Sequence, residues 1–193
     1  LIADMSSDML SRPVDFQKFD FIYAGVQKNL GPAGVVLVVA KKDLLAKSPE
    51  TLPTMLRYNT FLKKDSLYNT PPAFCIYMVG KVAAWIKANG GLVEMEKRNQ
   101  KKAKVVYDAI DNSNGFYRGH ADKDSRSFMN VTFRLPSEDL EKKFVAEALE
   151  HQLSGVKGHR SVGGMRASIY NAMPYEGALR LAEFMEKFRQ ENA

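Results

Sequence analysis

Apolar and polar residues follow one another along this chain in patterns that predict three short strands in its first 40 residues. The runs at residues 1–3, 19–23 and 34–40 are rich in aliphatic, β-branched or aromatic side chains and are separated by turn-forming residues. The third run contains the unbroken stretch Val-Val-Leu-Val-Val, so it is predicted to be a strand buried on both faces.

A helical pattern follows the sequence Asn69-Thr70-Pro71-Pro72, in which the prolines start a helix and Thr70 is placed to cap it. Apolar residues then recur at helical spacing, and Trp85 on this stripe is predicted to lie in the core. The sequence Asn89-Gly90-Gly91 ends the helix, and a second helix follows it.

The last third of the chain is predicted to be an α+β unit. Residues 129–135 alternate between apolar and polar, as in a half-buried strand, and Ser137 then caps a helix. Four positions are predicted to form the apolar side of this helix: Leu140, Phe144, Ala148 and Leu149. A strand from Met165 to Tyr170 and a final amphipathic helix over 176–190 complete the unit.

Composition is that of a globular protein with a sizeable core, because 45% of the 193 residues are hydrophobic and 26% are charged. The one cysteine, Cys75, argues against a disulfide framework and fits a reducing compartment. No apolar run approaches the about 20 residues that span a bilayer. No signal peptide opens the chain, so a cytoplasmic protein without membrane contact is expected.

The net charge of +6 raises nucleic acid as a partner. The densest basic stretch, residues 96–104, contains interleaved glutamate and lacks the aromatic residues that bind single strands. It is therefore predicted to be a solvated helix face, and no nucleic-acid partner is expected. A positive net charge also suits an enzyme whose cofactor and substrates are anions.

The main candidate for chemistry is Lys28, which lies in a glycine-rich turn between the second and third predicted strands. Gly25, Gly31 and Gly34 permit sharp turns and a close approach to a ligand. The turn is not a phosphate-binding P-loop, because that motif is absent. Lys28 is therefore either an ordinary surface lysine or an amine that forms a Schiff base with pyridoxal phosphate.

Pyridoxal phosphate needs a carboxylate that keeps its pyridine nitrogen protonated. Asp4 is the candidate, because it follows the first apolar run and so lies at a strand end. The other interpretation of Asp4 is a cap or turn residue.

A second set of candidate residues lies near the C-terminus. In the strand from Met165, Arg166 points away from the core, and its planar guanidinium suits bidentate capture of a carboxylate. His159 and Arg160 lie between glycines and suit a second anion. The alternative is a basic loop on a basic protein.

Four blocks of sequence together resemble the phosphoserine aminotransferases, in the class V branch of the fold-type I pyridoxal-phosphate enzymes. The blocks are Ala3-Asp4-Met5-Ser6-Ser7, Tyr23-Ala24-Gly25-Val26-Gln27-Lys28-Asn29, Tyr68-Asn69-Thr70-Pro71-Pro72, and Lys157 to Ser168. They occur in the order of that family and span nearly the whole chain.

The resemblance implies an α/β fold. Residues 1–90 would be the C-terminal part of the cofactor-binding large domain, a mixed sheet with helices, together with a linking helix. Residues 91–193 would be a small α+β domain. Because the family's motifs begin here in mid-domain, with three neighbouring strands of a seven-stranded sheet, we expect a piece of a longer protein. Alone it would be a poor aminotransferase with a weak or empty cofactor site and an unpaired sheet edge.

The resemblance also implies roles for the candidate residues. Lys28 would form the Schiff base with pyridoxal 5'-phosphate and move the proton of the substrate α-carbon, Asp4 would pair with the pyridine nitrogen, and Gln27 would contact the cofactor phosphate. Asn69 and Thr70 would reach the phosphate of the cofactor that the partner subunit mainly holds, which implies a homodimer.

For the substrates, the resemblance implies that Arg166 binds the α-carboxylate. His159 and Arg160 would bind the distal phosphate or, in glutamate, the distal carboxylate. No metal is implied.

The implied reaction is transfer of an amino group from glutamate to 3-phosphohydroxypyruvate, which gives 2-oxoglutarate and O-phosphoserine in serine biosynthesis. Two alternatives remain at this point: another class V pyridoxal-phosphate enzyme with a different amino-acid substrate, and a non-catalytic chain that only folds and self-associates.

Overall fold

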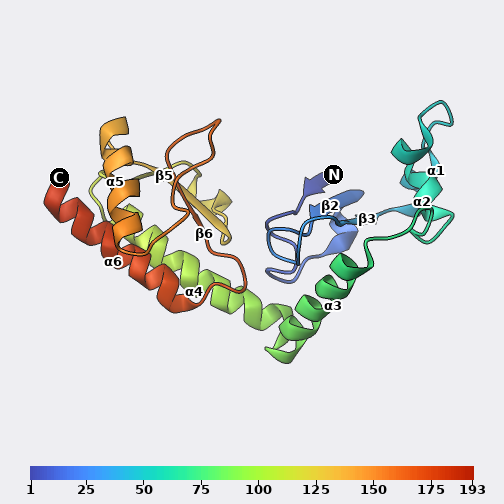
Figure 1. The fold of residues 1–193 in the computed structure, drawn as a ribbon, viewed down its shortest axis with the longest axis horizontal. Helices are drawn as coiled ribbons and strands as arrows, with labels where there is room; N and C mark the ends of the chain where they lie inside the picture. Colours follow the sequence, from blue (N-terminus) through green and yellow to red (C-terminus); the bar gives the residue numbers. More distant parts are fainter. The chain divides into compact units, whose positions relative to one another are not determined.

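The computed structural model describes all 193 residues, and the chain divides into two compact units, Leu1–Leu92 and Val93–Ala193 (Figure 1). The first unit contains a small mixed sheet and the second an antiparallel sheet with long helices. This is the expected combination of sheets and helices, and the α/β class is confirmed. Each unit is described below by itself.

The sheet of the first unit has the order β1-β2-β3, formed by Ile2–Asp4, Phe21–Gly25 and Val36–Ala40. β1 runs parallel to β2, with Asp4 paired to Tyr23, and β2 runs antiparallel to β3. Beside the sheet, the turn residues Met5, Met9, Val26 and Leu30 form a core with Ile22 and Ala24 of β2. The unit therefore buries the centre of its sheet and the turns at the end of β1 and β2.

The prediction that the third strand is buried on both faces was wrong. Val36 is 61% exposed and Leu37 is 38% exposed, and no residue of β3 is fully buried. β3 lies at one edge of the sheet, and only Val39 of this strand packs on the core of the unit. An apolar run makes a strand suitable for burial on both faces, but each face is buried only where another element packs against it.

The rest of the first unit is helical or turn-like. Two short helices, α1 (Lys42–Ala46) and α2 (Tyr58–Leu62), precede α3 (Ala73–Ala88). Single turns of 3-10 helix lie at Phe16–Lys18 and Thr54–Leu56. None of the chain's helices is long and apolar enough to cross a membrane.

Two predictions for α3 were wrong. The residue at the N-cap position is Pro72, which makes no side-chain capping bond, so Thr70 lies too far upstream to cap the helix. Trp85 is 40% exposed, and Ile86 is the one fully buried residue of α3. The helix packs on the core of the first unit through Val79, and the side that carries Trp85 is not covered there.

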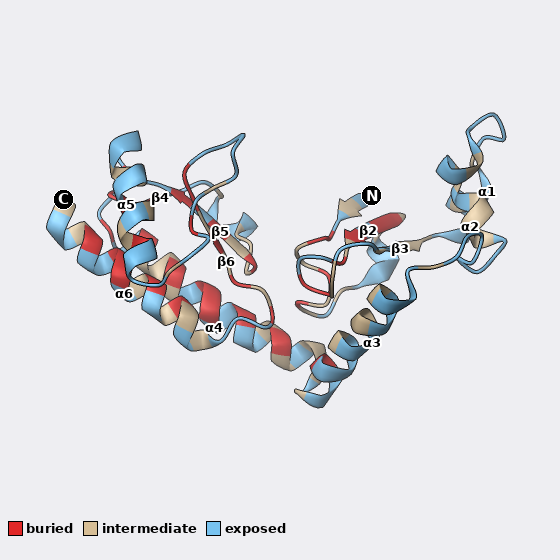
Figure 2. Cartoon of the chain, in the orientation of Figure 1, coloured by how far each residue is buried: buried red, intermediate tan, exposed pale blue.

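The second unit packs three helices with the sheet β4-β5-β6, whose strands are Arg118–Gly119, Asn130–Arg134 and Met165–Ser168. The helices are α4 (Gly91–Asp111), α5 (Glu138–Glu150) and α6 (Tyr175–Asn192), with a 3-10 turn at Lys123–Ser125. Figure 2 shows buried stripes along α4 and α6 with exposed residues on their other sides.

The predicted alternation of the two longer strands is confirmed. Within β5, the buried Val131 and Phe133 alternate with less buried residues, and within β6 the buried Met165 and Ala167 alternate with Arg166 and Ser168. The predicted cap of α5 is confirmed as well, because Ser137 Oγ accepts a hydrogen bond from the backbone N–H of Leu140 at 3.3 Å.

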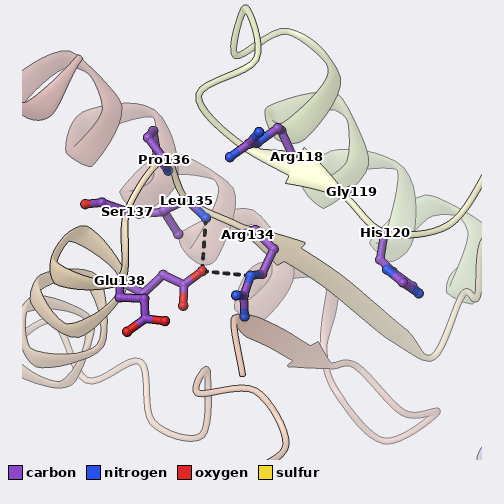
Figure 3. Close-up of a pocket in the computed structure, with 9 residues that line it drawn as sticks. Arg118, Gly119, His120, Arg134, Leu135, Pro136, Ser137 and Glu138 are labelled. Carbon is purple, nitrogen blue, oxygen red and sulfur yellow. Dashed lines mark hydrogen bonds and ion pairs between the residues drawn. The ribbon is translucent and has the colours of Figure 1, made fainter. Parts of the chain in front are cut away.

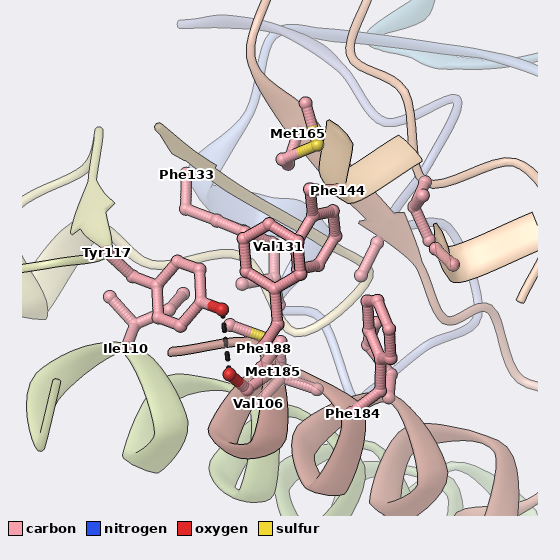
Figure 4. Packing of buried hydrophobic residues seen from close by; sticks show 14 of the residues in the cluster. Val106, Ile110, Tyr117, Val131, Phe133, Phe144, Met165, Phe184, Met185 and Phe188 are labelled. Atoms are coloured by element: carbon pink, nitrogen blue, oxygen red, sulfur yellow. Dashed lines mark hydrogen bonds between the residues drawn. The ribbon is translucent and has the colours of Figure 1, made fainter. Parts of the chain in front are cut away.

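Aromatic side chains fill the core of this unit (Figure 4). Phe144 of α5 is fully buried, and its ring centre lies 5.0 Å from that of Phe184 and 5.1 Å from that of Phe188, both on α6. Its contacts with Phe133 of β5 and with Tyr117 are also edge-to-face, a preferred geometry for aromatic pairs. Leu149, predicted to share this apolar side, is instead 65% exposed.

The basic stretch of α4 is not a uniformly solvated face, as the sequence had predicted. Lys102 is only 2% exposed, and Nζ donates hydrogen bonds to the backbone carbonyls of Tyr170 at 2.6 Å and Ile169 at 3.1 Å. Burial lowers the pKa of Lys102 to about 8. This lysine therefore joins α4 to the chain just beyond β6 and is not part of a basic surface.

Replacing Phe144 by alanine is expected to destabilise the second unit by about 3–5 kcal/mol, because it empties a fully packed aromatic site. Leu149→Ala, on the exposed side of the same helix, is the matched control and should change stability by less than about 0.5 kcal/mol. Urea unfolding followed by far-ultraviolet circular dichroism measures both. Equal effects of the two substitutions would contradict this assignment of the core.

Candidate functional site

Lys28 lies where the sequence predicted, in the turn that joins β2 to β3. The backbone N–H groups of Leu30 and Gly31 donate to the carbonyl of Val26, and Val26 N–H donates to Val35, so the turn is closed on itself. Val26, Asn29 and Leu30 are buried, whereas Lys28 is exposed. The turn therefore anchors three side chains in the core and leaves the lysine amine free to meet a ligand.

Helix α3 packs closely against this turn. A Cβ added at Gly31 would lie 3.2 Å from Val79 Cγ2, and one at Gly34 would lie 3.3 Å from Cys75 Sγ. Gly34 also has a positive φ of 121°, which side-chain-bearing residues rarely adopt. The Cys75 thiol donates to the carbonyl of Ala33 at 3.3 Å. The glycines thus let the helix hold the turn that carries Lys28.

Asp4 is the last residue of β1, at the same end of the sheet as the turn that follows β2. Its Oδ1 accepts hydrogen bonds from the Ser6 hydroxyl at 2.6 Å and from the Ser6 backbone N–H at 2.8 Å. These bonds, with smaller contributions from the Tyr23 hydroxyl and the positive charge of Lys28, lower the pKa of Asp4 below its usual value. The site therefore holds an ionised carboxylate within the electrostatic reach of a lysine amine.

Ser6 and Tyr23 support Asp4, and the sequence analysis did not single them out. The Ser6 hydroxyl also accepts from the backbone N–H of Gly25 at 3.0 Å, so it joins the end of β1 to the end of β2. Tyr23 stands directly opposite Asp4 in the parallel ladder, and the hydrogen bond to that carboxylate raises the pKa of Tyr23. Both residues stand in the sequence blocks quoted for the family resemblance, but only the strand register shows that they meet at Asp4.

Gln27 is exposed, and its side chain folds over Gly25, because a Cβ added there would lie 2.7 Å from Gln27 Oε1. Asn69 and Thr70 are exposed residues of the segment before α3. The structure does not join them to Asp4 or to the turn of Lys28: the Asn69 amide donates to the neighbouring carbonyl of Thr70 at 3.1 Å. The first unit thus brings together Asp4, Gln27 and Lys28 from the predicted set.

In the second unit, Arg166 lies on β6 opposite Thr132 of β5, on the sheet face away from the buried side chains. On the same face, Asn130 Oδ1 accepts hydrogen bonds from the hydroxyls of Ser168 at 3.1 Å and Tyr170 at 3.3 Å. Arg166 Nε is buried and has no hydrogen-bond partner among the residues of the chain. A buried guanidinium nitrogen without a partner is costly, so this position is suited to an anionic ligand.

His159 and Arg160 are exposed on a tight loop that leads into β6. The His159 carbonyl accepts from the backbone N–H groups of Val162 at 3.0 Å and Gly163 at 2.8 Å, and Gly158 N–H donates to Gly164 at 2.7 Å. Gly163 and Gly164 both have positive φ, 75° and 66°. The loop is therefore a defined turn that presents two basic side chains to solvent.

Comparison with known proteins identifies the class. The family model described as aminotransferase class-V matches residues 1–181, which is most of the chain. The chain therefore belongs to the class-V aminotransferases.

Several relatives with high sequence identity are phosphoserine aminotransferases. A phosphoserine aminotransferase of Lysinibacillus sphaericus is 59% identical over the full chain, which covers 53% of that protein. The solved phosphoserine aminotransferase from Bacillus circulans subsp. alkalophilus is 59% identical, with a TM-score of 0.93 over 100% of this chain and 53% of that one. The chain thus spans about half the length of the relatives it matches.

A more distant relative has been solved with pyridoxal phosphate bound. It is the phosphoserine aminotransferase from Trichomonas vaginalis with pyridoxal phosphate bound, 40% identical with a TM-score of 0.89. This match covers 96% of the present chain and 53% of the other.

Ser6→Ala is expected to raise the pKa of Asp4, because it removes the hydroxyl hydrogen bond that lowers this pKa most. Ser7→Ala is the control, since Ser7 donates no hydrogen bond to Asp4. A carbon-detected NMR titration of the Asp4 carboxyl measures both variants. An Asp4 pKa that stays unchanged in Ser6→Ala would show that the Ser6 hydroxyl is not the main cause and that the Ser6 backbone N–H, Tyr23 and Lys28 account for the lowered pKa.

Proposed function

We propose that this protein acts as a pyridoxal-phosphate-dependent phosphoserine aminotransferase, which exchanges an amino group between glutamate and 3-phosphohydroxypyruvate. The observation that carries the proposal is the ionised carboxylate of Asp4 beside the turn of Lys28, at the ends of two adjacent parallel strands. The relatives at 59% identity bear the name of this activity, and one at 40% binds pyridoxal phosphate.

The residues present fit the cofactor. Bound pyridoxal phosphate supplies an electron sink for reactions at the α-carbon of amino acids. Asp4, whose hydrogen bonds favour the ionised form, would pair with the pyridine nitrogen and keep it protonated. The Lys28 amine would hold the cofactor covalently, and Gln27 would contact its phosphate group.

Lys28 also has the role of the proton carrier in this proposal. Once an incoming amino donor had displaced it, its Nζ would take the proton from the donor's α-carbon and pass it to the bound cofactor. The anchored turn suits this task, because its backbone is fixed by buried neighbours while the side chain is exposed and free to move.

Arg166 would bind the α-carboxylate that every amino donor and acceptor shares. Its buried and unpartnered Nε supports this role, because a carboxylate would satisfy it through a charge-assisted hydrogen bond. His159 and Arg160 would bind the distal phosphate of O-phosphoserine or the distal carboxylate of glutamate. Their exposed place on a fixed loop leaves both side chains accessible to such an anion.

The remaining proposals concern assembly. We assign residues 1–90 to the cofactor-binding domain and residues 91–193 to the small domain, in line with the division of the structure after Leu92. Asn69 and Thr70 make no bond to the cofactor residues of their own unit, which suits a role toward the cofactor of a partner subunit in a homodimer.

The single free cysteine suits a cytoplasmic location.

In the intact enzyme, Lys28→Ala is expected to abolish the near-visible absorbance of the lysine–cofactor linkage and to reduce transamination on the order of 10³-fold or more, with an unchanged unfolding midpoint. The exposed Lys18 provides the control Lys18→Ala, which should retain both signals. Absorbance with added pyridoxal phosphate and glutamate-dependent amination of 3-phosphohydroxypyruvate measure the outcome. A Lys28→Ala protein with parental turnover would disprove the proposal.

Arg166→Ala is expected to lower kcat/KM roughly 10- to 100-fold for both O-phosphoserine and L-alanine, since both carry the α-carboxylate. Arg160→Ala should lower it for O-phosphoserine by a similar factor and leave L-alanine unaffected. Arg180→Ala, an exposed arginine of α6, is the control. Steady-state kinetics with the two donors separates the roles, and equal loss for both donors in Arg160→Ala would refute a distal-anion role.

A further inference from the structure

Arg134, the last residue of β5, connects the loop that carries His159 and Arg160 to the rest of the second unit. Its Nη1 donates a hydrogen bond to the backbone carbonyl of Val162 at 3.1 Å, and its Nε forms an ion pair with Glu141 Oε1 of α5 at 3.2 Å. One planar side chain thus joins a strand, a helix and a loop. No sequence motif pointed to it.

Glu141 is well placed to hold this arginine. Its side chain is only 12% exposed, and its Oε1 also accepts from the backbone N–H of Leu135 at 3.4 Å (Figure 3). Arg134 stands opposite Arg118 in the β4–β5 ladder, a like-charge pair that would be unfavourable without a counter-ion. Glu141 supplies that negative charge and fixes the direction of the guanidinium.

The loop rests directly on the Arg134 side chain. A Cβ added at Gly163 would lie 2.6 Å from Arg134 Nη1, and one added at Gly164 would lie 2.6 Å from Arg134 Cδ. Gly163 N–H in turn donates to the His159 carbonyl at 2.8 Å. Arg134 therefore contacts Gly163, and Gly163 in turn holds the backbone of His159.

We propose that Arg134, held by Glu141, is a positioning residue that fixes the loop of residues 158–164 and thereby sets the preference for substrates with a distal anion. This inference rests on the proposed function, in which His159 and Arg160 of that loop bind the distal anion. In this role Arg134 acts through the loop, because its Nε is paired with Glu141 and its Nη1 with the loop backbone.

Substitution of Glu141 distinguishes positioning from a direct electrostatic role. If Arg134 attracted the substrate by its charge, removal of the neighbouring carboxylate would raise the positive potential and strengthen binding of phosphorylated substrates. If Arg134 positions the loop, the same change releases the guanidinium and weakens their binding. The two roles predict opposite signs.

Two measurements on Glu141→Ala and Arg134→Met test the proposal. Hydrogen exchange of the peptide that covers residues 157–165 should become faster on the order of tenfold, because the loop loses its anchor. In the intact, cofactor-loaded enzyme, the kcat/KM ratio of O-phosphoserine to L-alanine should fall on the order of tenfold, mainly through KM for O-phosphoserine.

The controls come from the same elements. Glu147→Ala removes a glutamate of α5 that pairs with Lys143 at 3.7 Å, and should change neither measurement. Arg134→Lys keeps the charge but loses the planar fork, so its ratio should lie between those of the parent and Arg134→Met. If Glu141→Ala does not fold, the comparison of Arg134→Lys with the parent still tests the proposal.

An unchanged or increased preference for O-phosphoserine in Glu141→Ala would overturn the positioning role, as would unchanged exchange of the loop. An intact parent enzyme that binds the cofactor but does not transaminate would overturn the proposed function and the substrate preference that rests on it. Hydrogen exchange would in that case still decide separately whether Arg134 anchors the loop.

Discussion

The parallel pairing of β1 with β2 is the constraint on which the first candidate site depends. It sets Asp4 opposite Tyr23 and brings Ser6 to the backbone N–H of Gly25, so the carboxylate is supported by groups from both strand ends. A slip of one residue would turn Asp4 to the other face of the sheet. The turn that carries Lys28 begins at the end of the same β2, so one register aligns the acid and the amine.

The second candidate site depends on a different constraint, the close approach of backbone to side chain. The loop of residues 158–164 can rest on Arg134 because Gly163 and Gly164 have no Cβ and accept positive φ. Gly158 allows the same closeness within the loop, since a Cβ there would lie 2.0 Å from the Gly163 carbonyl oxygen. These glycines convert a flexible sequence into a fixed support for His159 and Arg160.

The aromatic core and the site of the second unit lie on opposite faces of one sheet. Alternation along β5 and β6 sends Phe133 and Met165 into the core and Thr132 and Arg166 to the other face. Lys102 then ties the chain beyond β6 to α4 through two backbone carbonyls. Packing on one face therefore stabilises the strand that presents Arg166 on the other.

The sequence alone determined the features that depend on local conformation. The glycine-rich turn around Lys28, the Ser137 cap and the outward direction of Arg166 follow from neighbours within a few residues, and the structure has all three. Burial of Trp85, Leu149 and the third strand was predicted wrongly from equally good local patterns. Periodicity defines which side chains share a face, but not whether another element covers that face.

Tertiary structure decided every contact between residues far apart in the chain. Ser6 with Gly25, Lys102 with the end of β6, and Arg134 with Val162 are joined across 19 to 68 residues. Such bonds depend on strand register and on how helices dock, which arise from the packing of the whole unit and leave no local signature. The sequence thus determined which groups are available for chemistry, and the tertiary structure decided which of them meet.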